Sequence, residues 1–236
     1  MHKIGFITVL TLICLKSINT FSQNQKENHS TINKELQLDN ALVNNGKPFN
    51  DNEVSTEKEH RYFLENKLYT EEIKYDNQVY LNSKLKYDIY KDEIILNPDL
   101  QPSKTLYIIN KEKVDYFTIQ NRKFVKIKLV KNKPEEYIEE SINTKQFTLY
   151  IKYIKINKGI TLEKKSIKTY ISETKYFIKI GNDIHEVKSK KSILKLYPQL
   201  KSEIDDFYRF TGDLEKENNV MFMENLMLTV KKFLNK

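Results

Sequence analysis

The residues best suited to acid–base or metal chemistry are a histidine and its acidic neighbours close to the end of the β-rich part of the chain. His185 lies between Asp183 and Glu186 in the stretch "GNDIHEVK". Histidine titrates near neutral pH and is a common catalytic base and metal ligand. On a strand, however, His185 and Glu186 are adjacent and point to opposite faces. We therefore expect His185 to be a surface histidine without a catalytic or metal-binding role.

A second acidic group lies within the stretch "LKYDIYKDE". Asp88, Asp92 and Glu93 carry the carboxylate oxygens that hard cations prefer. They occupy turn positions and outward positions of a predicted hairpin, where carboxylates are usually solvated. We expect no metal site here.

Glutamates also crowd the stretch "PEEYIEE", at Glu135, Glu136, Glu139 and Glu140. They are too close in sequence to flank a glycosidic bond from both sides, as the two carboxylates of a glycosidase do. Proline and acidic residues both suit the first turn of a helix. This stretch is therefore predicted to be a short inserted helix.

Other catalytic classes lack their residues. The glycines are isolated, so neither a phosphate-binding loop nor a nucleophile elbow can be assembled. The single cysteine, Cys14, lies in an apolar N-terminal run, and its removal with that run would exclude disulfides and thiolate catalysis. We predict no catalytic residue, no metal and no cofactor, and hence a protein that is not an enzyme.

The N-terminus has the pattern of a secretory signal. Lys3 precedes an uncharged apolar run from Ile4 to Leu15, and the small residues Thr20 and Ser22 follow it. A helical run of about 12 residues spans about 18 Å, well short of the ~30 Å hydrocarbon core of a membrane. We predict a signal peptide over residues 1–22, cleavage between Ser22 and Gln23, and no transmembrane span in the mature chain.

Lysine supplies almost all of the positive charge. The chain has 40 basic and 32 acidic residues, and loss of residues 1–22 would leave a net charge of +6. Sequence-specific nucleic-acid recognition favours the guanidinium fork of arginine, which occurs only three times. No such partner is expected. Lysines between residues 145 and 195 are candidates for binding an anionic surface, in particular Lys152, Lys155, Lys164, Lys165, Lys188, Lys190 and Lys191.

The expected organisation is a flexible polar leader over residues 23–60 and one β-rich domain over residues 61–236 with a helical C-terminus. The leader has too few apolar residues to offset the entropy of ordering it. Period-two patterning with short turns then predicts antiparallel strands. The predicted strands are Lys67–Tyr75, Gln78–Leu81, Leu85–Tyr90, Glu93–Leu96, Thr105–Ile109, Val114–Ile119, Lys123–Val130, Phe147–Ile156, Ser166–Ser172, Tyr176–Ile180 and Ile184–Val187.

The same alternation predicts which side chains face the core and which face solvent. Leu85, Tyr87 and Ile89 are predicted to face a core, and Lys86, Asp88 and Tyr90 to face solvent. The uninterrupted "IIL" at residues 94–96 predicts a strand covered on both faces. A change of apolar parity between Tyr153 and Ile154 predicts a β-bulge.

Helical spacing replaces the period of two after residue 190. It predicts helices over about residues 190–210 and 218–235, with Ser192 as the N-cap of the first and Pro198 dividing it. The expected fold class is α+β. An antiparallel sheet, sandwich-like or an incomplete barrel, is followed by C-terminal helices that pack on it.

Three stretches carry a resemblance to a known group. They are "LKYDIYKDEIIL", "VDYFTIQNRKFVKI" and "KYFIKIGNDIHEVKSKKSILKLYPQLKSEI". With a signal ending in "FSQ", the chain resembles uncharacterised exported proteins of flavobacteria and their relatives, over roughly residues 67–210. The resemblance implies the periplasm or cell envelope of a Gram-negative bacterium, and it implies no catalytic residue. The acidic "PEEYIEE" and the tail after Thr211 are less typical of that group.

The sequence favours a non-enzymatic exported module of the cell envelope, with a binding or structural role and an envelope polymer or protein as its partner. Two alternatives stay open. One is a hydrolase of envelope polymers that uses carboxylates and His185 brought together by folding. The other is a protein that binds polyanions or membrane surfaces through its lysine-rich face.

Overall fold

The structure is a computed structural model that describes residues 45–51, 53, 59–98, 105–130, 132–162 and 165–235, without the side chains of residues 160–162 and 165–167. The predicted signal peptide and its cleavage point between Ser22 and Gln23 lie outside the described residues. So does most of the predicted leader.

Strands dominate the first three quarters of the described chain. They are β1 (Lys47–Phe49), β2 (Tyr69–Tyr75), β3 (Gln78–Asp88), β4 (Glu93–Asn97), β5 (Leu106–Ile108), β6 (Val114–Ile119), β7 (Arg122–Ile127), β8 (Glu136–Asn143), β9 (Thr148–Asn157), β10 (Ile160–Leu162), β11 (Lys165–Ile167), β12 (Tyr170–Ile180) and β13 (Asp183–Val187). Eleven of them form one open antiparallel sheet in the order β1-β5-β4-β3-β2-β6-β7-β8-β9-β12-β13, and β10 pairs with β11.

Local turn chemistry explains why neighbouring strands pair. Asp76 and Asn77, between β2 and β3, both have positive φ, as do Gln120 and Asn121 between β6 and β7. Two consecutive residues with positive φ form the tight turn whose twist matches that of antiparallel strands. The predicted hairpins therefore form from short-range signals, and the predicted strands 78–81 and 85–90 join into the single strand β3.

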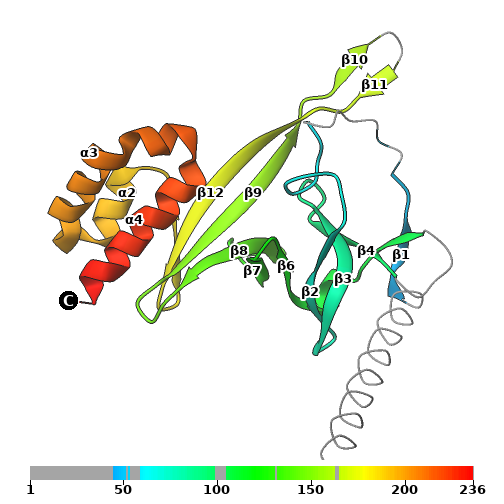
Figure 1. Ribbon diagram of the computed structural model, residues 1–236, viewed down its shortest axis with the longest axis horizontal. Coiled ribbons are helices and arrows are strands. Elements are labelled where there is room, and N and C mark those ends of the chain that lie inside the picture. The colour runs from blue at the N-terminus through cyan, green and yellow to red at the C-terminus, as the bar shows by residue number, and fades with distance from the viewer. Residues whose placement is uncertain are drawn as a thin grey trace, which may run out of the picture.

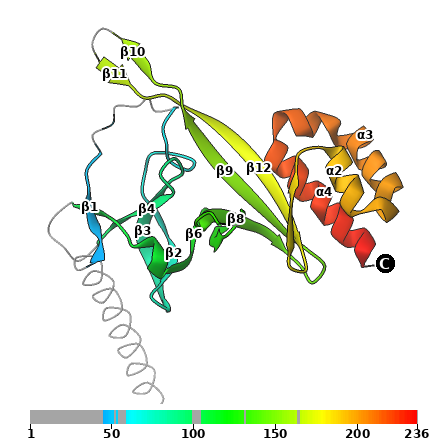
Figure 2. The same ribbon diagram turned by 180° about the vertical axis from the view of Figure 1, so that it is seen from behind.

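The sheet changes character along its length. The strands from β2 to β8 curl strongly, whereas β9 and β12 form a long twisted ribbon that carries the β10–β11 hairpin at its end (Figure 1). The helices lie beside the other end of this ribbon, away from β1 to β4, as Figure 2 also shows from behind. The molecule is thus elongated, with a strand region and a helical region joined by β9 and β12.

Four helical segments follow β13: α2 (Lys190–Leu196), the 3₁₀-helix η2 (Pro198–Leu200), α3 (Lys201–Glu217) and α4 (Asn219–Leu234). They pack against the sheet, which confirms the α+β class with an open antiparallel sheet. Pro198 starts a new segment as predicted. The N-cap of α2 is Ser189 instead of Ser192, because Ser192 lies one turn later and its hydroxyl accepts the backbone N–H of Ser189 at 3.0 Å.

Two clusters of buried side chains stabilise these regions. The strand core lies inside the curl of β2 to β8 and includes Phe63, Leu85, Tyr87, Phe117, Phe124 and Tyr137. The helix core lies between β9, β12, β13 and the helices and includes Leu149, Ile178, Phe222, Leu226 and Met227. Tyr153 packs against both cores. The buried stretch from Ile94 to Leu96 confirms the prediction of a strand covered on both faces.

Two local predictions in the second half of the sheet are wrong. The stretch "PEEYIEE" is not a helix, because Glu136–Asn143 forms strand β8 between β7 and β9. Both Tyr137 and Ile138 are buried there, so packing overrides the helix-start signal of proline and acids. The β-bulge lies in β8, between Glu140 and Ile142, and β9 pairs with β12 without a register shift at Tyr153.

The described part of the predicted leader also differs from expectation. Lys47–Phe49 forms the edge strand β1, which pairs with β5. Phe49 is buried against Tyr62 and Ile95. Pairing with an existing sheet edge supplies the backbone hydrogen bonds that the sparse apolar pattern did not indicate.

Candidate functional site

A groove of about 410 Å³ lies where the β3–β4 turn and the segment after β7 face the ribbon of β9 and β12. Its apolar lining includes Tyr90, Val130, Ile154 and Phe177. Four lysines and three acids also line it, namely Lys133, Lys152, Lys155, Lys175, Asp92, Glu136 and Glu186. A concave surface that combines aromatic rings with converging charges is a typical binding site.

Strand register brings several of these side chains together. Lys152 on β9 pairs directly with Lys175 on β12, and Tyr150 pairs with Phe177. Because alternate residues share one face of a strand, these residues lie opposite Ile151 and Tyr176, which belong to the helix core. Lys152, Lys175 and Phe177 thus line the groove from the face that points away from the helix core, whereas Tyr153 and Lys155 have the same parity as Ile151.

Lys152 belongs to the internal structure of the molecule and not to an exposed basic face. Its side chain is buried, donates a hydrogen bond to the carbonyl of Tyr137 at 2.9 Å, and forms ion pairs with Asp92 and Glu136 at 3.6 and 3.7 Å. The expectation that Lys152 offers its charge to an external anion is therefore wrong. Acids that arrive from the β3–β4 turn and β8 already neutralise it.

Lys155 differs from Lys152 in having no carboxylate partner. It is half-buried in the groove, and among the ion pairs of the described residues none includes it. Burial lowers the pKa of Lys155, and no acid opposes this shift. Removing an ammonium group from water without a counter-ion is unfavourable. An anion bound in the groove would relieve that cost.

A cluster of charged side chains surrounds the buried Arg61 in the strand region. The guanidinium group is 3% exposed and forms ion pairs with Asp51, Glu53 and Asp88 at 3.3, 2.7 and 2.6 Å. Asp88 is fully buried, so its predicted outward position is wrong. Burial raises the pKa of Asp88 to about 6, against the opposing effects of the Lys91 backbone N–H and Arg61. We call these four residues the Arg61 cluster.

The same cluster explains the second outward prediction that fails, which is Lys86. This lysine is buried, its ammonium lies 3.9 Å from the centre of the Tyr62 ring, and it donates to the side chain of Asn66 at 3.0 Å. The strand alternation itself is correct. The segment around residues 60–62 and strand β1 cover the second face of β3, so that both faces are buried.

Glu53 connects the Arg61 cluster to the start of β12. Its carboxylate accepts hydrogen bonds from Lys168 and Tyr170, both at 2.7 Å. Burial alone would raise the pKa of Glu53, but the bonds from Lys168, Tyr170 and Arg61 outweigh it and lower the pKa to about 2. Glu53 is therefore ionised at all ordinary pH values and holds residues from three distant segments together.

Asp92, one of the three acids weighed as cation ligands, is engaged by other groups of the protein. Asp92 forms an ion pair with Lys111 and accepts hydrogen bonds from the hydroxyl of Tyr87 and the backbone N–H of Tyr137. Within the part of the chain that the structure describes, no group of three or more potential ligands could hold a metal ion.

A third buried carboxylate, Glu139, joins the sheet to the last helix. It accepts hydrogen bonds from Arg122 at 2.9 and 3.0 Å and from Tyr153 at 2.6 Å. Arg122 also lies 3.8 Å from Glu224 on α4. Burial raises the pKa of Glu139, although Tyr153 and Arg122 oppose the shift. This group positions α4 against β7 to β9.

His185 lies on β13, paired with Ile178 of β12, and is half-buried. Its neighbour Glu186 projects from the opposite face, lines the groove and pairs with Lys188 at 3.1 Å. The structure thus does not bring His185 and Glu186 together.

The remaining lysines of the predicted anion-binding set do not gather on one face. Lys190 pairs with Asp205 at 2.7 Å, and Lys191 is exposed on the short helix α2. Both lie on α2, in the helical region, whereas Lys155 lies on β9. The side chains of Lys164 and Lys165 lie outside the described residues.

The groove itself has no counterpart in the sequence analysis. Tyr90, Lys133 and Phe177 come from three segments that no short sequence pattern connects. The one available signal is the exposed aromatic position of Tyr90 at a turn.

Comparison of the chain with family models, with curated proteins and with solved structures finds no match. None of the helices in the described ranges combines the length and apolar character of a membrane span.

Proposed function

We propose that the protein is a non-catalytic binding module of the bacterial cell envelope, and that the groove holds an anionic envelope polymer. The observation that carries this proposal is Lys155, a half-buried cation without a carboxylate partner among the described residues. The site would thus gain from a ligand that supplies a negative charge.

The aromatic lining favours a polymer built from sugar rings. Tyr90 is 45% exposed at the groove, and Phe177 lies on the strand β12. Aromatic side chains can pack against the apolar C–H faces of sugar rings. Asp92 and Glu136 are already paired with lysines, so they do not cancel the charge of Lys155 or Lys133. An acidic polysaccharide matches both properties.

A binding role also fits the fact that the buried acidic side chains already have partners within the protein. A hydrolase would need two carboxylates that face a substrate, one of them free to transfer a proton. Asp88 and Glu139 are the buried acids with a raised pKa, and each is engaged by an arginine that connects structural segments. Export to the envelope is supported by the signal-like N-terminus and by the resemblance to exported proteins.

Binding to an acidic polysaccharide tests the proposal. The mature chain from Gln23 would be titrated with polygalacturonate and with its methyl-esterified, neutral form. Each titration is done at about 50 and about 300 mM salt, because salt screens attraction between charges. We expect binding to the acidic form that weakens with salt. Lys155→Gln and Phe177→Ala should each weaken it at least about tenfold.

Two matched variants control for general charge and apolar surface. Lys191→Gln removes an exposed lysine on α2, and Ile171→Ala removes an exposed apolar residue on β12 outside the groove. Both should bind as the wild type does. Equal loss from Lys191→Gln would instead favour loose attraction to a lysine-rich surface. Equal binding of the acidic and neutral polymers would refute the proposal.

A further inference from the structure

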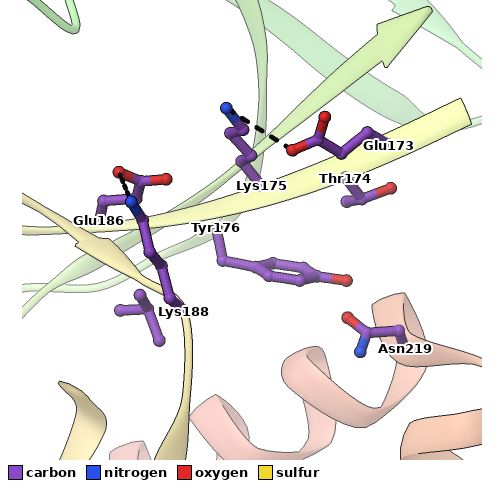
Figure 3. Close-up of a pocket in the computed structure, with 8 residues that line it drawn as sticks. Glu173, Thr174, Lys175, Tyr176, Glu186, Lys188 and Asn219 are labelled. Atoms are coloured by element: carbon purple, nitrogen blue, oxygen red, sulfur yellow. Dashed lines mark ion pairs between the residues drawn. The ribbon is translucent and has the colours of Figure 1, made fainter.

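A second cavity of about 400 Å³ lies on the other side of the ribbon, between β12, β13 and the start of α4. Its lining includes Thr174 and Tyr176 from β12 and Asn219, the first residue of α4 (Figure 3). Polar groups predominate among these residues. The cavity shares Lys175 and Glu186 with the groove, but its other lining residues differ and it is more polar in character.

Tyr176 provides an unused hydrogen-bonding group inside this cavity. The residue is 6% exposed, and its hydroxyl oxygen is buried without a hydrogen-bond partner among the described residues. In Figure 3 the hydroxyl points along the cavity toward the side of Thr174 and Asn219. Burial, followed by the carboxylates of Glu224 and Glu139, raises the pKa of Tyr176. The hydroxyl thus stays protonated and can donate a hydrogen bond to a ligand.

The start of α4 supplies further donors at the same place. The side chain of the N-cap Asn218 accepts the backbone N–H of Met221 at 3.0 Å. By their position in the first turn, the N–H groups of Asn219 and Val220 have no acceptor within the helix. The first turn contains no acidic residue. The N-terminus of a helix of 16 residues attracts negative charge, and here α3 ends at Glu217 immediately before it.

The rim of the cavity carries charges of both signs. Glu173 pairs with Lys175 at 3.6 Å, and Glu186 pairs with Lys188 at 3.1 Å. Figure 3 shows both pairs above the Tyr176 ring. These pairs are solvent-exposed and therefore weak, so a ligand can exchange with either partner. The rim suits a ligand body with hydroxyl or ammonium groups.

We infer that this cavity is a second binding site, which takes a small carboxylate compound of the size of an amino acid or a sugar acid. The carboxylate accepts hydrogen bonds from the Tyr176 hydroxyl and from the first N–H groups of α4. The body of the ligand contacts the charged rim. The site shares Lys175 and Glu186 with the polymer groove, but Tyr176 and Asn219 line only the cavity and Lys155 lines only the groove, so either proposal can fail without the other.

Heteronuclear NMR titration of the mature protein tests this inference. The probes are sodium glutamate, sodium galacturonate and, as a neutral sugar, galactose. Both acids should shift the amide signals of Asn219 and Val220, and galactose should not. A stronger effect of glutamate would identify a zwitterion as the preferred ligand, and a stronger effect of galacturonate a sugar acid.

Tyr176→Phe removes the hydroxyl and keeps the ring in the helix core. It should weaken binding of the preferred acid at least about tenfold, as expected for the loss of a hydrogen bond to a charged group. Tyr197→Phe is the matched control, because Tyr197 is also buried in the helix core with an unpaired hydroxyl but does not line the cavity. That variant should bind normally.

Three results would overturn the inference. They are no shift at Asn219 and Val220 with either acid, equal shifts with galactose, or equal affinities of the two tyrosine variants. Lys175 and Glu186 line both the cavity and the groove, so neither is used as a test position. Loss of polymer binding in Lys155→Gln leaves this experiment unaffected, which keeps the two proposals separable.

Discussion

The strand core and the helix core are stabilised in different ways. Half of the strand core is aromatic, namely Phe63, Tyr69, Tyr75, Tyr80, Tyr87, Phe117, Phe124 and Tyr137. The helix core is mainly aliphatic and methionine. Among the described residues, every buried charged side chain lies before residue 153, in the strand region or at its border: Arg61, Lys86, Asp88, Glu139 and Lys152.

This difference has an energetic consequence. Apolar burial contributes about 25 cal/mol per Å² and does not depend on the ionisation of a side chain. A buried charge contributes favourably only while its partner is present and ionised. The strand region should thus respond to loss of a charge and to acid, whereas the helical region should respond mainly to loss of volume.

The largest expected effect comes from removing Arg61. Arg61→Met leaves Asp88 buried without its cation and releases Asp51 and Glu53 from the cluster. We expect a loss of about 3–5 kcal/mol in the free energy of unfolding, measured by urea denaturation. Arg209→Met is the control, because Arg209 is exposed and pairs only with Asp206 among the described acids. It should change stability by less than about 0.5 kcal/mol. Equal effects of the two variants would show that the cluster does not stabilise the strand region.

A smaller effect is expected from a cavity in the helix core. Leu226 is fully buried on α4, and Leu228 on the same helix is 47% exposed. Leu226→Ala should cost about 3 kcal/mol, and Leu228→Ala should change stability by less than about 0.5 kcal/mol. Helical circular dichroism during urea unfolding measures both. If Leu226→Ala is as mild as Leu228→Ala, α4 does not depend on its buried face.

Sequence patterning predicts the strands and helices of this fold better than it predicts which distant segments pack against them. Hairpins such as β6–β7 and the helices after residue 190 depend on contacts between near neighbours, which periodicity and turn residues report. The failed predictions concern what covers an element from far along the chain. Asp88 and Lys86 have the predicted parity, yet strand β1 and Arg61 bury their face.

The candidate sites show the same limit more strongly. Lys155 could be recognised as basic from the sequence, but its missing partner depends on where the acids of distant strands lie. The hydroxyl of Tyr176 is buried without a partner among the described residues, in a cavity where the start of α4 lies beside β12. Neither property exists in a short window of residues, so no local pattern could have indicated it.

The central claim is that charge pairing stabilises the strand region and apolar burial the helical region. Since the pKa of Glu53 is lowered to about 2 in the folded state from its usual value of 4.5, its contribution is complete above pH 4.5 and is lost as the pH falls toward 2. Asp88 acts in the opposite sense between pH 6 and 3.8, because its pKa is raised. The acid loss below pH 4.5 therefore belongs to Glu53.

Amide hydrogen exchange, corrected for the intrinsic exchange rates, tests the claim directly when it is measured at about pH 5 and about pH 2.5. These two values span most of the range over which the contribution of Glu53 is lost. We expect the amides of β3 and β4 to lose protection on acidification, while those of α4 and the adjoining half of β12 keep it. Glu53→Gln should remove most of this pH dependence. Simultaneous loss of protection in both regions, or earlier loss in α4, would contradict the account.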